Sequence, residues 1–540
     1  MTARARRSVL ATLVTLTLAL NGAVQSADDP DCLVRLRGLN LQTATVLDIQ
    51  TALADGRLTS RRLVRRYLER IAFFDSSGPA LNSIRELHPG VLAQARRLDA
   101  ERERGILRGP LHGIPVVLKD NIGTVDMPTT AGSIALEGSI PLHDAFLTAQ
   151  LREAGAIILG KANLSEFANW VDPTMPSGYS SLGGQVINPY RFADTPSGSS
   201  SGSGVAATMA LSTVTVGTET SGSIISPSYA NSVVGLKPTL GLISRAGVIP
   251  LAESFDTAGP MARTVTDAAI LLGAMTGVDP RDPATAPSEG HVPPGADYTP
   301  FLHSESLEGA RMGFDPDDRP GGDQGLVWDQ ALADLEAAGA EIVSIDGLDS
   351  TSLAGLAEIA AIPNEFKSGL NRYLAQETEP TLRVRTLSDI VAYNEQHPDK
   401  VKYGQKWLQI SDAQRGDAGD PVAVANREAA VQGSRAAIDR AFSQYELDAV
   451  IAPNSTYVNV GAAAGYPTIT VPAGYTEEGQ LPIGLSFTGQ AWDEAELLGF
   501  AFAYEQHSLR RVPPTAVNPD LFPDGCSRLA TTEQARLAAA

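Results

Sequence analysis

Two serines and one lysine in the first half of the chain have the residue types that covalent catalysis requires. Ser199 and Ser223 lie 24 positions apart in a serine- and glycine-rich stretch, 195–238. A serine hydroxyl is a poor nucleophile at neutral pH until a neighbouring base removes its proton. Lys119 ends the apolar run 113–119, and burial there would lower the pKa of its amine so that it could act as this base. The three residues predict a hydrolase with a serine nucleophile.

A second kind of serine chemistry also fits this stretch. Residues 198–202 match the G-x-S-x-G pattern of a nucleophile elbow, with Ser200 as the nucleophile. That pattern needs a strand directly before the serine, whereas the prolines within 189–196 predict a loop. It also needs a histidine further along the chain, and the polar helical surroundings of His397 and His507 favour solvated surface positions. We therefore disfavour the elbow.

Metal and cofactor chemistry finds no support in the sequence. There is no phosphate-binding P-loop, and His112 has no partner at a metal-ligand spacing. Neither Cys32 nor Cys526 stands at such a spacing or beside a histidine that would mark a catalytic thiol. Because lysine, serine and backbone donors suffice for hydrolysis by a serine nucleophile, we expect no metal and no cofactor.

The elements that must position these residues alternate between helices and strands. The strand predicted at 114–118 ends at Lys119, which places the lysine at a strand end where it can face a site. An amphipathic helix over 46–74 is interrupted at 55–56 and can be capped again at 59–60. The other predicted elements are helices at 90–104, 146–153, 205–211 and 330–338, a mostly helical region at 350–445, and strands at 156–159, 214–216, 310–314, 341–345, 449–453, 468–471 and 483–487. This order predicts an α/β fold with a substantial central sheet.

Length and composition predict a globular protein with a large core. The chain has 540 residues, of which 43% are hydrophobic. A long loop rich in proline, aspartate and glycine, 277–300, separates the serine-rich half from the rest. The formal net charge of −20 disfavours a nucleic-acid partner, because such a surface repels phosphates. We interpret the acidity as a solubility feature.

Residues 1–26 have the pattern of an export signal. Three arginines precede an apolar run over 9–20, and a cleavage site near Ser26 would leave a mature chain that begins near Ala27. The apolar run is too short to span a bilayer, which disfavours a retained anchor. We expect a secreted or periplasmic protein without stable membrane insertion, exported by either the Sec or the twin-arginine route.

The two cysteines stand near the two ends of the mature chain. Cys32 follows the export signal, and Cys526 lies close to the C-terminus. An exported protein can keep a disulfide, so this pair could join the two ends. Two free thiols also fit the sequence, and both alternatives stay open.

Beyond these patterns, the chain resembles the amidase signature family of Ser-Ser-Lys amide hydrolases, over most of the mature sequence. The matching segments are 119–122 (KDNI), 129–133 (TTAGS), 163–167 (NLSEF), 198–203 (GSSSGS), 217–223 (GTETSGS), 235–238 (GLKP), 465–467 (GYP) and 484–485 (GL). Each segment alone is a weak signal, but their shared order is specific. The resemblance implies a large central mixed β-sheet covered by helices on both faces. It also implies one amidase domain, 27–540, with a catalytic core at about 45–275 and 440–515 and a variable, substrate-shaping region at about 280–420.

The resemblance implies a role for each residue of the site. Lys119 would be the base, Ser199 would follow a cis peptide bond and relay protons, and Ser223 would attack the amide carbon. Backbone N–H groups would stabilise the oxyanion. These groups belong to Thr220, Ser221, Gly222 and Ser223.

Other polar residues nearby have structural interpretations. We interpret Ser200, Ser201 and Ser203 as capping or backbone-supporting residues of the helix that begins at Val205. Lys237, beside a proline, is interpreted as structural rather than catalytic.

Within the family, the chain looks most like bacterial peptide amidases, which remove the C-terminal amide of peptides. Part of this likeness lies in 177–180, 384–390 and 403–405. Two positions depart from the pattern. Ser221 stands where the family commonly has glycine and where peptide amidases resemble an aspartate, and Ile225 stands where the family often has arginine. These departures affect substrate identity more than reaction type.

The sequence therefore predicts an exported amidase that hydrolyses carboxylic amides to acid and ammonia, with small-molecule amides and C-terminal peptide amides as candidate substrates. A general aliphatic or aryl amidase or an esterase of the same family is one alternative. The amidotransferase subunit that supplies ammonia for charging transfer RNA is another, although the export signal and the net charge argue against it. A non-catalytic amidase-like binding module would be expected to have lost the nucleophile or the lysine. Oligomeric state stays open.

Overall fold

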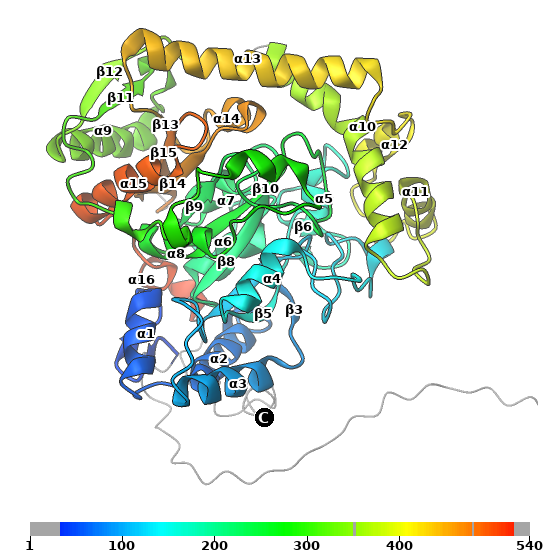
Figure 1. Cartoon of the computed structure of the whole chain (residues 1–540), viewed down its shortest axis with the longest axis horizontal. Coiled ribbons are helices and arrows are strands. Elements are labelled where there is room, and N and C mark those ends of the chain that lie inside the picture. Colours follow the sequence, from blue (N-terminus) through cyan, green and yellow to red (C-terminus); the bar gives the residue numbers. More distant parts are fainter. Residues whose placement is uncertain (1–32, 349–352, 478–479, 523–540) are drawn as a thin grey trace, which may run out of the picture.

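The structure of the protein is a computed structural model that describes residues 33–348, 353–477 and 480–522 (Figure 1). The expected export signal at 1–26 lies outside the described residues, as do Cys32 and Cys526. The export of the protein and the pairing of its cysteines therefore stay predictions.

A mixed sheet of 11 strands forms the centre of the described chain. In spatial order its strands are β12 (Glu341–Ser344), β11 (Arg311–Phe314), β13 (Ala449–Pro453), β15 (Pro482–Thr488), β14 (Thr468–Tyr475), β9 (Val234–Lys237), β10 (Thr257–Ala262), β8 (Val214–Glu219), β4 (Pro115–Lys119), β5 (Ile157–Ala162) and β3 (Ile84–Leu87). Strand β4 is parallel to β5 and β8, and β11 is parallel to β12 and β13. The other neighbouring strands are antiparallel. This sheet confirms the predicted α/β fold with a large mixed sheet.

Strands from distant parts of the sequence meet within this sheet. Thr468 of β14 lies opposite Lys237 of β9. The strands within 449–488 and the strands within 84–262 therefore belong to one sheet. Two small hairpins, β1 (Arg35–Leu36) with β2 (Leu39–Asn40) and β6 (Tyr179–Ser180) with β7 (Gly184–Gln185), lie outside it. The division into a catalytic core and a variable region stays a prediction.

Helices cover both faces of the sheet. The helices are α1 (Val46–Ala54), α2 (Ser60–Arg70), α3 (Val91–Glu103), α4 (Phe146–Glu153), α5 (Glu166–Asn169), α6 (Ser201–Thr208), α7 (Ile225–Ala230), α8 (Val265–Gly273), α9 (Gly322–Ala337), α10 (Leu353–Gln376), α11 (Leu387–Glu395), α12 (Lys406–Asp412), α13 (Pro421–Tyr445), α14 (Val458–Ala464), α15 (Glu494–Ser508) and α16 (Pro514–Val517). Helices α6 and α7 contact each other and pack on β4, β8, β9 and β14. Helix α15 contacts both α8 and α9, and these three helices pack on strands that include β8, β9, β10, β14 and β15. No helix among the described residues has the length and apolar character that crossing a membrane requires.

The strands that were predicted from the sequence differ in composition from the strands that were missed. Every residue of β4 is buried, and its run of aliphatic residues is typical of a parallel strand that is covered on both faces. Strand β10 was not predicted, because Gly259 and Pro260 lower its strand propensity. Strands β3 and β9, with four residues each, were also missed. Tertiary pairing, rather than local propensity, forms these three strands.

The first two helices follow the sequence prediction. Helix α1 ends at Ala54, next to the predicted break at 55–56, and α2 begins at Ser60. The Thr59 hydroxyl caps α2 by accepting a hydrogen bond from the Arg62 backbone N–H. A short π-helix, Ile71–Asp75, then continues the chain.

Two predicted helices have different bounds in the structure. The helix expected at 205–211 is α6, which begins at Ser201 and ends at Thr208. The helix expected at 330–338 is α9, which begins earlier, at Gly322. In both cases the added first turn contains serine or glycine, whose low helix propensity hides it from the sequence pattern. All eight residues of α6 are buried, so packing overrides propensity there.

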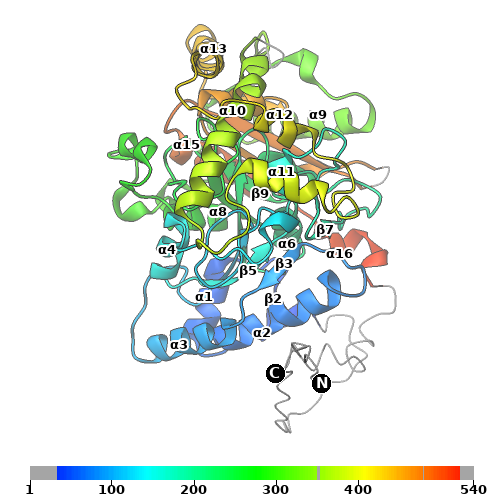
Figure 2. The ribbon, with the colours of Figure 1, turned by 90° about the vertical axis from the view of Figure 1, so that its right-hand side faces the viewer.

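The predicted helical region at 350–445 is confirmed as α10 to α13. Helix α13 runs across one end of the molecule towards α10 (Figure 1). Helices α10, α11 and α12 lie together on one side (Figure 2). Phe366 and Leu370 of α10 share an apolar cluster with Ile249, Leu251 and Phe255. This cluster fixes the helical layer against the loop before β10, which borders the candidate site.

Candidate active site

Strand β4 brings Lys119 to a fully buried position between β5 and β8. The Lys119 Nζ atom lies 2.7 Å from Ser199 Oγ, 2.9 Å from Thr218 Oγ1 and 3.0 Å from the Thr218 carbonyl oxygen. The structure therefore brings the predicted base and the predicted relay serine into direct contact.

The surroundings of Lys119 favour the neutral form of its amine, which is the form that a base requires. Burial removes the hydration of the ammonium and lowers the pKa of Lys119 to about 7, although the carboxylates of Asp256 and Glu219 partly oppose this shift. A neutral amine has two N–H groups and one lone pair, so the lysine can donate only two of its three contacts. In that form the third contact is accepted from the hydroxyl of Ser199 or Thr218.

Thr218 and Asn121 belong to this site, although neither was among the predicted site residues. The Asn121 side-chain amide donates to Thr218 Oγ1 at 2.9 Å, the same oxygen that contacts Lys119. Both residues lie in segments that carry the family resemblance, 119–122 and 217–223. Position within those segments was the only available signal, since threonine and asparagine are common in loops.

Two other buried lysines show that a lowered pKa alone does not identify the base. Burial lowers the pKa of Lys161 to about 7 and that of Lys237 to about 8. Lys161 donates to Thr129 Oγ1 at 2.7 Å, and Lys237 donates to the Pro238 carbonyl oxygen at 3.1 Å. Of these three lysines, only Lys119 has a serine hydroxyl among the hydrogen bonds of the described residues. Its contact with Ser199 therefore distinguishes it.

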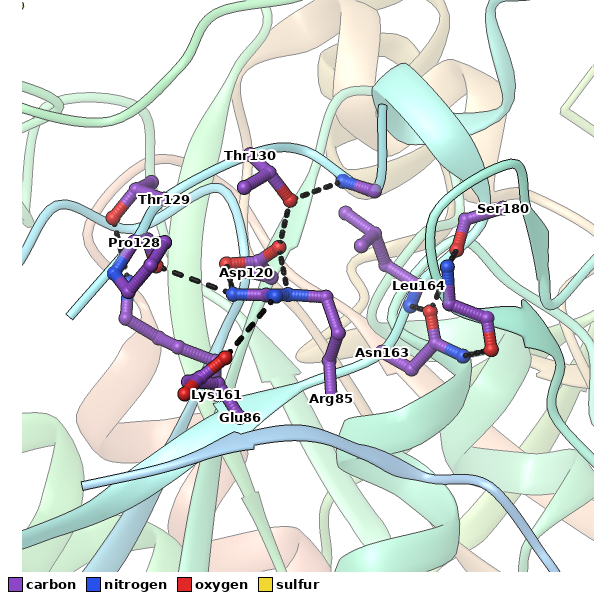
Figure 3. A network of polar contacts seen from close by, with 12 residues as sticks. Arg85, Glu86, Asp120, Pro128, Thr129, Thr130, Lys161, Asn163, Leu164 and Ser180 are labelled. Carbon is purple, nitrogen blue, oxygen red and sulfur yellow. Dashed lines mark hydrogen bonds and ion pairs between the residues drawn. The ribbon is translucent and has the colours of Figure 1, made fainter. Parts of the chain in front are cut away.

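A polar network holds the loop that follows Lys119 (Figure 3). Arg85 of β3 pairs with Asp120, with 2.5 Å between Nε and Oδ2, and donates to the Pro128 carbonyl oxygen at 3.3 Å. The Thr130 hydroxyl donates to the same carboxylate. Because Asp120 directly follows Lys119, the predicted base, this network fixes the strand end that carries Lys119.

Ser199 lies just before α6 and is almost fully buried. A cis peptide bond joins Gly198 to Ser199, as the family resemblance implied. The Ser199 carbonyl oxygen accepts from the Ser165 N–H at 3.0 Å, and the Ser200 N–H donates to the Ser223 carbonyl oxygen at 3.1 Å. The two candidate serines are thus tied through the backbone. Among the described residues, no hydrogen bond joins the Ser199 and Ser223 hydroxyls directly.

Glu219 closes the turn that carries Ser223. Its Oε2 atom accepts from the Ile224 N–H at 2.7 Å and from the Ile225 N–H at 3.0 Å, so the carboxylate folds the chain back on itself. The backbone N–H groups of Ser221, Gly222 and Ser223 have no acceptor within the described part of the chain. Free N–H donors beside a nucleophile can stabilise an oxyanion. Glu219 was not predicted.

Gly222 is required by the shape of this turn. Its φ of +83° lies in the left-handed region, and an added Cβ would lie 3.0 Å from Ser226 Oγ and 3.1 Å from Val458 Cγ2. The absence of a side chain therefore permits both the backbone conformation and the close approach of α14.

Asp256 anchors the other side of the turn. The Thr220 hydroxyl donates to Asp256 Oδ1 at 2.5 Å, and the Leu251 and Ala252 N–H groups donate to Oδ2 at 2.8 and 3.0 Å. Burial raises the pKa of Asp256 to about 6, because the site withholds water from the carboxylate. This residue, also unpredicted, connects the turn to the loop before β10.

The elbow alternative does not match the structure. Ser200 Oγ donates to the Thr218 carbonyl oxygen at 3.0 Å and accepts from the Thr218 N–H at 3.2 Å, and it makes no cap hydrogen bond to α6. Ser203 Oγ donates to the Val216 carbonyl oxygen at 3.0 Å. Because α6 begins at Ser201, Ser201 and Ser203 lie within the helix and do not cap it. Of the two expected roles, capping and backbone support, the structure shows backbone support for these serines.

Neither His112 nor His507 offers an alternative base at the candidate site. His507 is exposed at the end of α15, and His112 is buried with its Nε2 atom 3.0 Å from the Leu98 carbonyl oxygen. No group of three or more histidine, cysteine or acidic residues that could hold a metal ion occurs among the described residues.

Comparison with known proteins identifies the class that this fold and site define. The Amidase family model matches residues 62–498. The crystal structure of a peptide amidase from Stenotrophomonas maltophilia superposes with a TM-score of 0.82 at 42% identity, covering 87% of this chain and 98% of that one. A probable amidase of Arabidopsis thaliana is 40% identical over 93% of this chain and 96% of its own length. One of the subunits of the glutamyl-tRNA(Gln) amidotransferase of Cereibacter sphaeroides is 34% identical over 87% of this chain and 98% of its own length.

The chain therefore belongs to the amidase signature family. It is an enzyme, an amidase, which is a hydrolase that acts on carbon–nitrogen bonds. Lys119 and Ser223 are both present, whereas a non-catalytic binding module would be expected to have lost one of them. Family membership leaves open the role of each site residue and the identity of the substrate.

Proposed function

We propose that the protein is an exported amidase that hydrolyses C-terminal peptide amides to a free carboxylate and ammonia, with Ser223 as the nucleophile. The observation that carries the mechanism is the 2.7 Å contact between Lys119 Nζ and Ser199 Oγ in a fully buried site. The resemblance to a peptide amidase supports the substrate class. The apolar, arginine-preceded segment at 1–26 supports export.

In the proposed first half-reaction, neutral Lys119 accepts the proton of Ser199 as Ser199 accepts the proton of Ser223. The Ser223 oxygen attacks the amide carbon, and the carbonyl oxygen becomes an oxyanion. Backbone N–H groups of the 220–223 turn donate to this oxyanion and stabilise it. Ser199 then returns a proton to the nitrogen, the carbon–nitrogen bond breaks, and ammonia leaves an acyl-enzyme ester on Ser223.

The second half-reaction reverses these proton transfers with water in place of ammonia. Ser199 and Lys119 take a proton from the water, whose oxygen attacks the ester carbon. The ester bond breaks, Ser223 regains its proton, and the carboxylic acid is released. An ester passes through the same acyl-enzyme and has a better leaving group, so we expect esterase activity as well.

A general aliphatic or aryl amidase is the main competing function. Ser221 and Ile225 depart from the residues that the family resemblance leads us to expect beside the nucleophile. Both positions adjoin Ser223, so they affect the fit of the acyl group rather than the reaction. The amidotransferase alternative would require a cytoplasmic location, which the proposed export excludes.

Ammonia release by the purified mature protein tests this proposal. We expect release from a C-terminally amidated peptide to exceed release from simple aliphatic and aryl amides. Release from only the small amides would keep the reaction and reject the peptide substrate. Detection of the protein in the cytoplasm alone, with residues 1–26 still present, would reject export.

Ser223→Ala tests the nucleophile. We expect kcat to fall by at least about 10⁴-fold, because the acyl-enzyme can no longer form. Ser203→Ala is the matched control, since Ser203 is also a buried serine of this segment but bonds only to the backbone. A Ser223→Ala enzyme that keeps wild-type activity would reject the assignment.

A further inference from the structure

A buried glutamate of the helical layer reaches the turn that carries the nucleophile. Glu358 of α10 is 2% exposed, and its carboxyl group hydrogen-bonds the side chain of Ser221. Ser221 is partly exposed and stands two residues before Ser223, a separation of at most about 7 Å along an extended chain. Glu358 therefore lies beside the turn that carries Ser223.

The hydrogen bonds around Ser221 indicate which group donates in the contact between Ser221 and Glu358. The Ser221 hydroxyl donates its single proton to Asn459 Oδ1 of α14, at 2.9 Å. While the hydroxyl donates to Asn459, its contact with Glu358 is donated by a protonated carboxyl group. Donation from Ser221 to an ionised carboxylate would lower the pKa of Glu358, but burial and the nearby Glu219 carboxylate outweigh this effect and raise the pKa to about 8. This value agrees with a neutral acid at pH 7.

One oxygen of Glu358 remains unused. The Oε1 atom is buried and has no hydrogen-bond partner among the described residues. In a carboxylic acid whose hydroxyl oxygen donates to Ser221, the other oxygen is a carbonyl oxygen and accepts hydrogen bonds. A buried acceptor without a partner costs free energy, on the order of 1–3 kcal/mol, so a ligand N–H that reaches it gains affinity. The contact with Ser221 places the Glu358 carboxyl group beside the turn that would bind the acyl part of a substrate.

We propose that Glu358 is a specificity residue whose Oε1 atom accepts a hydrogen bond from the N–H on the α-carbon of the substrate's last residue. This proposal rests on the proposed function, because it requires a peptide or acylated amino-acid amide. Such a substrate carries an N–H one carbon away from the scissile carbonyl, whereas a simple aliphatic amide has none. Ser221 and Asn459 hold the carboxyl group in place for this contact.

A pair of matched substrates tests the contact. N-acetyl-L-leucinamide has the N–H, and its ester analogue, (S)-2-acetoxy-4-methylpentanamide, has an oxygen at that position and the same scissile amide. We expect the wild-type kcat/KM ratio of the first to the second to be at least about 10, because the analogue leaves the acceptor unpaired. A ratio near 1 would overturn the proposal.

Variants of Glu358 identify the acceptor. Glu358→Gln keeps an acceptor oxygen and supplies an N–H donor to Ser221, so we expect the ratio to stay within about threefold of wild type. Glu358→Met removes both groups, and the ratio should fall to near 1. The control is Glu365→Gln on the same helix, a buried glutamate whose oxygens accept from the Ser254 N–H and hydroxyl, and which should leave the ratio unchanged.

Three results separate the ways in which the proposal could fail. If Glu358→Met slows both substrates equally and keeps the ratio, Glu358 only positions the turn, and the specificity role is rejected. If Glu358→Met does not fold, Ser221→Ala must lower the ratio instead, because it removes the hydroxyl that fixes the carboxyl group, and an unchanged ratio rejects the role. If the wild-type enzyme releases ammonia from simple amides and from neither leucine derivative, the peptide substrate itself is rejected.

Discussion

We expect the environment of Lys119 to determine the pH dependence of the reaction. Its contact with Ser199 makes it the proposed base, and its pKa of about 7 sets the pH at which it gains a lone pair. The protonated amine cannot accept a proton, so activity should fall as the pH decreases through 7. Asp256 and Glu219 favour the charged form and keep this pKa from falling further.

Lys119→Met should lower kcat by about 10³-fold, within the range for loss of a general base. The wild-type kcat/KM should rise with an inflection near pH 7, and the residual activity of Lys119→Met should lack that inflection. Steady-state kinetics between pH 5 and 9 measure both effects.

Lys161→Met is the control for this experiment. Lys161 is equally buried and its pKa is also lowered to about 7, but it bonds to Thr129 and to the Ile122 carbonyl oxygen. We expect the inflection near pH 7 to persist in this variant. Loss of the inflection in Lys161→Met, or its persistence in Lys119→Met, would contradict the assignment of the base.

At the scale of elements, the turn between β8 and α7 depends on a glycine. Gly222→Ala adds a Cβ at a φ of +83°, 3.0 Å from Ser226 Oγ and 3.1 Å from Val458 Cγ2. The turn must shift, and the free N–H groups beside Ser223 shift with it. We expect kcat to fall by about 10²-fold, the cost of losing one oxyanion donor.

Gly56→Ala separates this effect from simple backbone strain. Gly56 has a φ of +67°, and an added Cβ would meet nothing within 4 Å. Both variants should lose about 1 kcal/mol of stability, but only Gly222→Ala should lose activity. Equal activity of the two variants would show that the turn does not position the oxyanion donors.

The loop after β4 depends on the pairing of Arg85 with Asp120. The Arg85 side chain is 9% exposed and that of Asp120 is 0% exposed, so Asp120→Ala leaves a nearly buried arginine without its carboxylate. We expect the free energy of unfolding to fall by about 3 kcal/mol. Denaturation in urea measures the change.

Asp55→Ala provides the comparison at an exposed ion pair. The side chains of Arg57 and Asp55 are 46% and 55% exposed, so water already solvates both charges. The expected loss of stability is below about 1 kcal/mol. If Asp120→Ala were as mild as Asp55→Ala, the network in Figure 3 would not hold the strand end.

For the molecule as a whole, buried acids determine how stability varies with pH. Burial raises the pKa of Asp75, Asp256 and Asp267 to about 6, of Glu166 to about 7 and of Glu505 to about 8. Between pH 5 and 7 the folded protein binds more protons at these groups than the unfolded chain does. Stability therefore decreases as the pH rises through this window. The net charge of −20 acts in the same direction, because repulsion between carboxylates destabilises the compact state.

We expect the free energy of unfolding to be lower at pH 7 than at pH 5 by at least about 2 kcal/mol. The buried lysines act outside this window, since a pKa lowered to about 7 changes stability only above that pH. Urea denaturation at pH 5, 6 and 7 tests the expectation. Repeating the measurement in about 0.5 M salt screens surface repulsion but not the buried groups. A stability that rises with pH would contradict this account.

The sequence by itself determined the reaction class and the α/β fold. Lys119, Ser199 and Ser223 stand in segments whose order is specific to the family, and the apolar run before Lys119 has the composition of a buried strand. The capping threonine at 59 and the break at 55–56 were visible for a different reason, because caps and turns depend on local residue chemistry.

Only the tertiary structure decided which other groups share the site. Thr218, Glu219, Asp256 and Glu358 have common residue types. Only the segment 217–223 marks Thr218 and Glu219, and nothing in the local sequence marks Asp256 or Glu358. Asp256 lies 36 positions from the Thr220 hydroxyl it accepts from, and Glu358 belongs to a different layer from the turn it contacts. Such contacts depend on how strands and helices distant in sequence pack together, and local propensity carries no information about that packing. The candidate reacting groups were therefore visible in the sequence, whereas the fold supplied the partners that set their pKa values and hold their geometry.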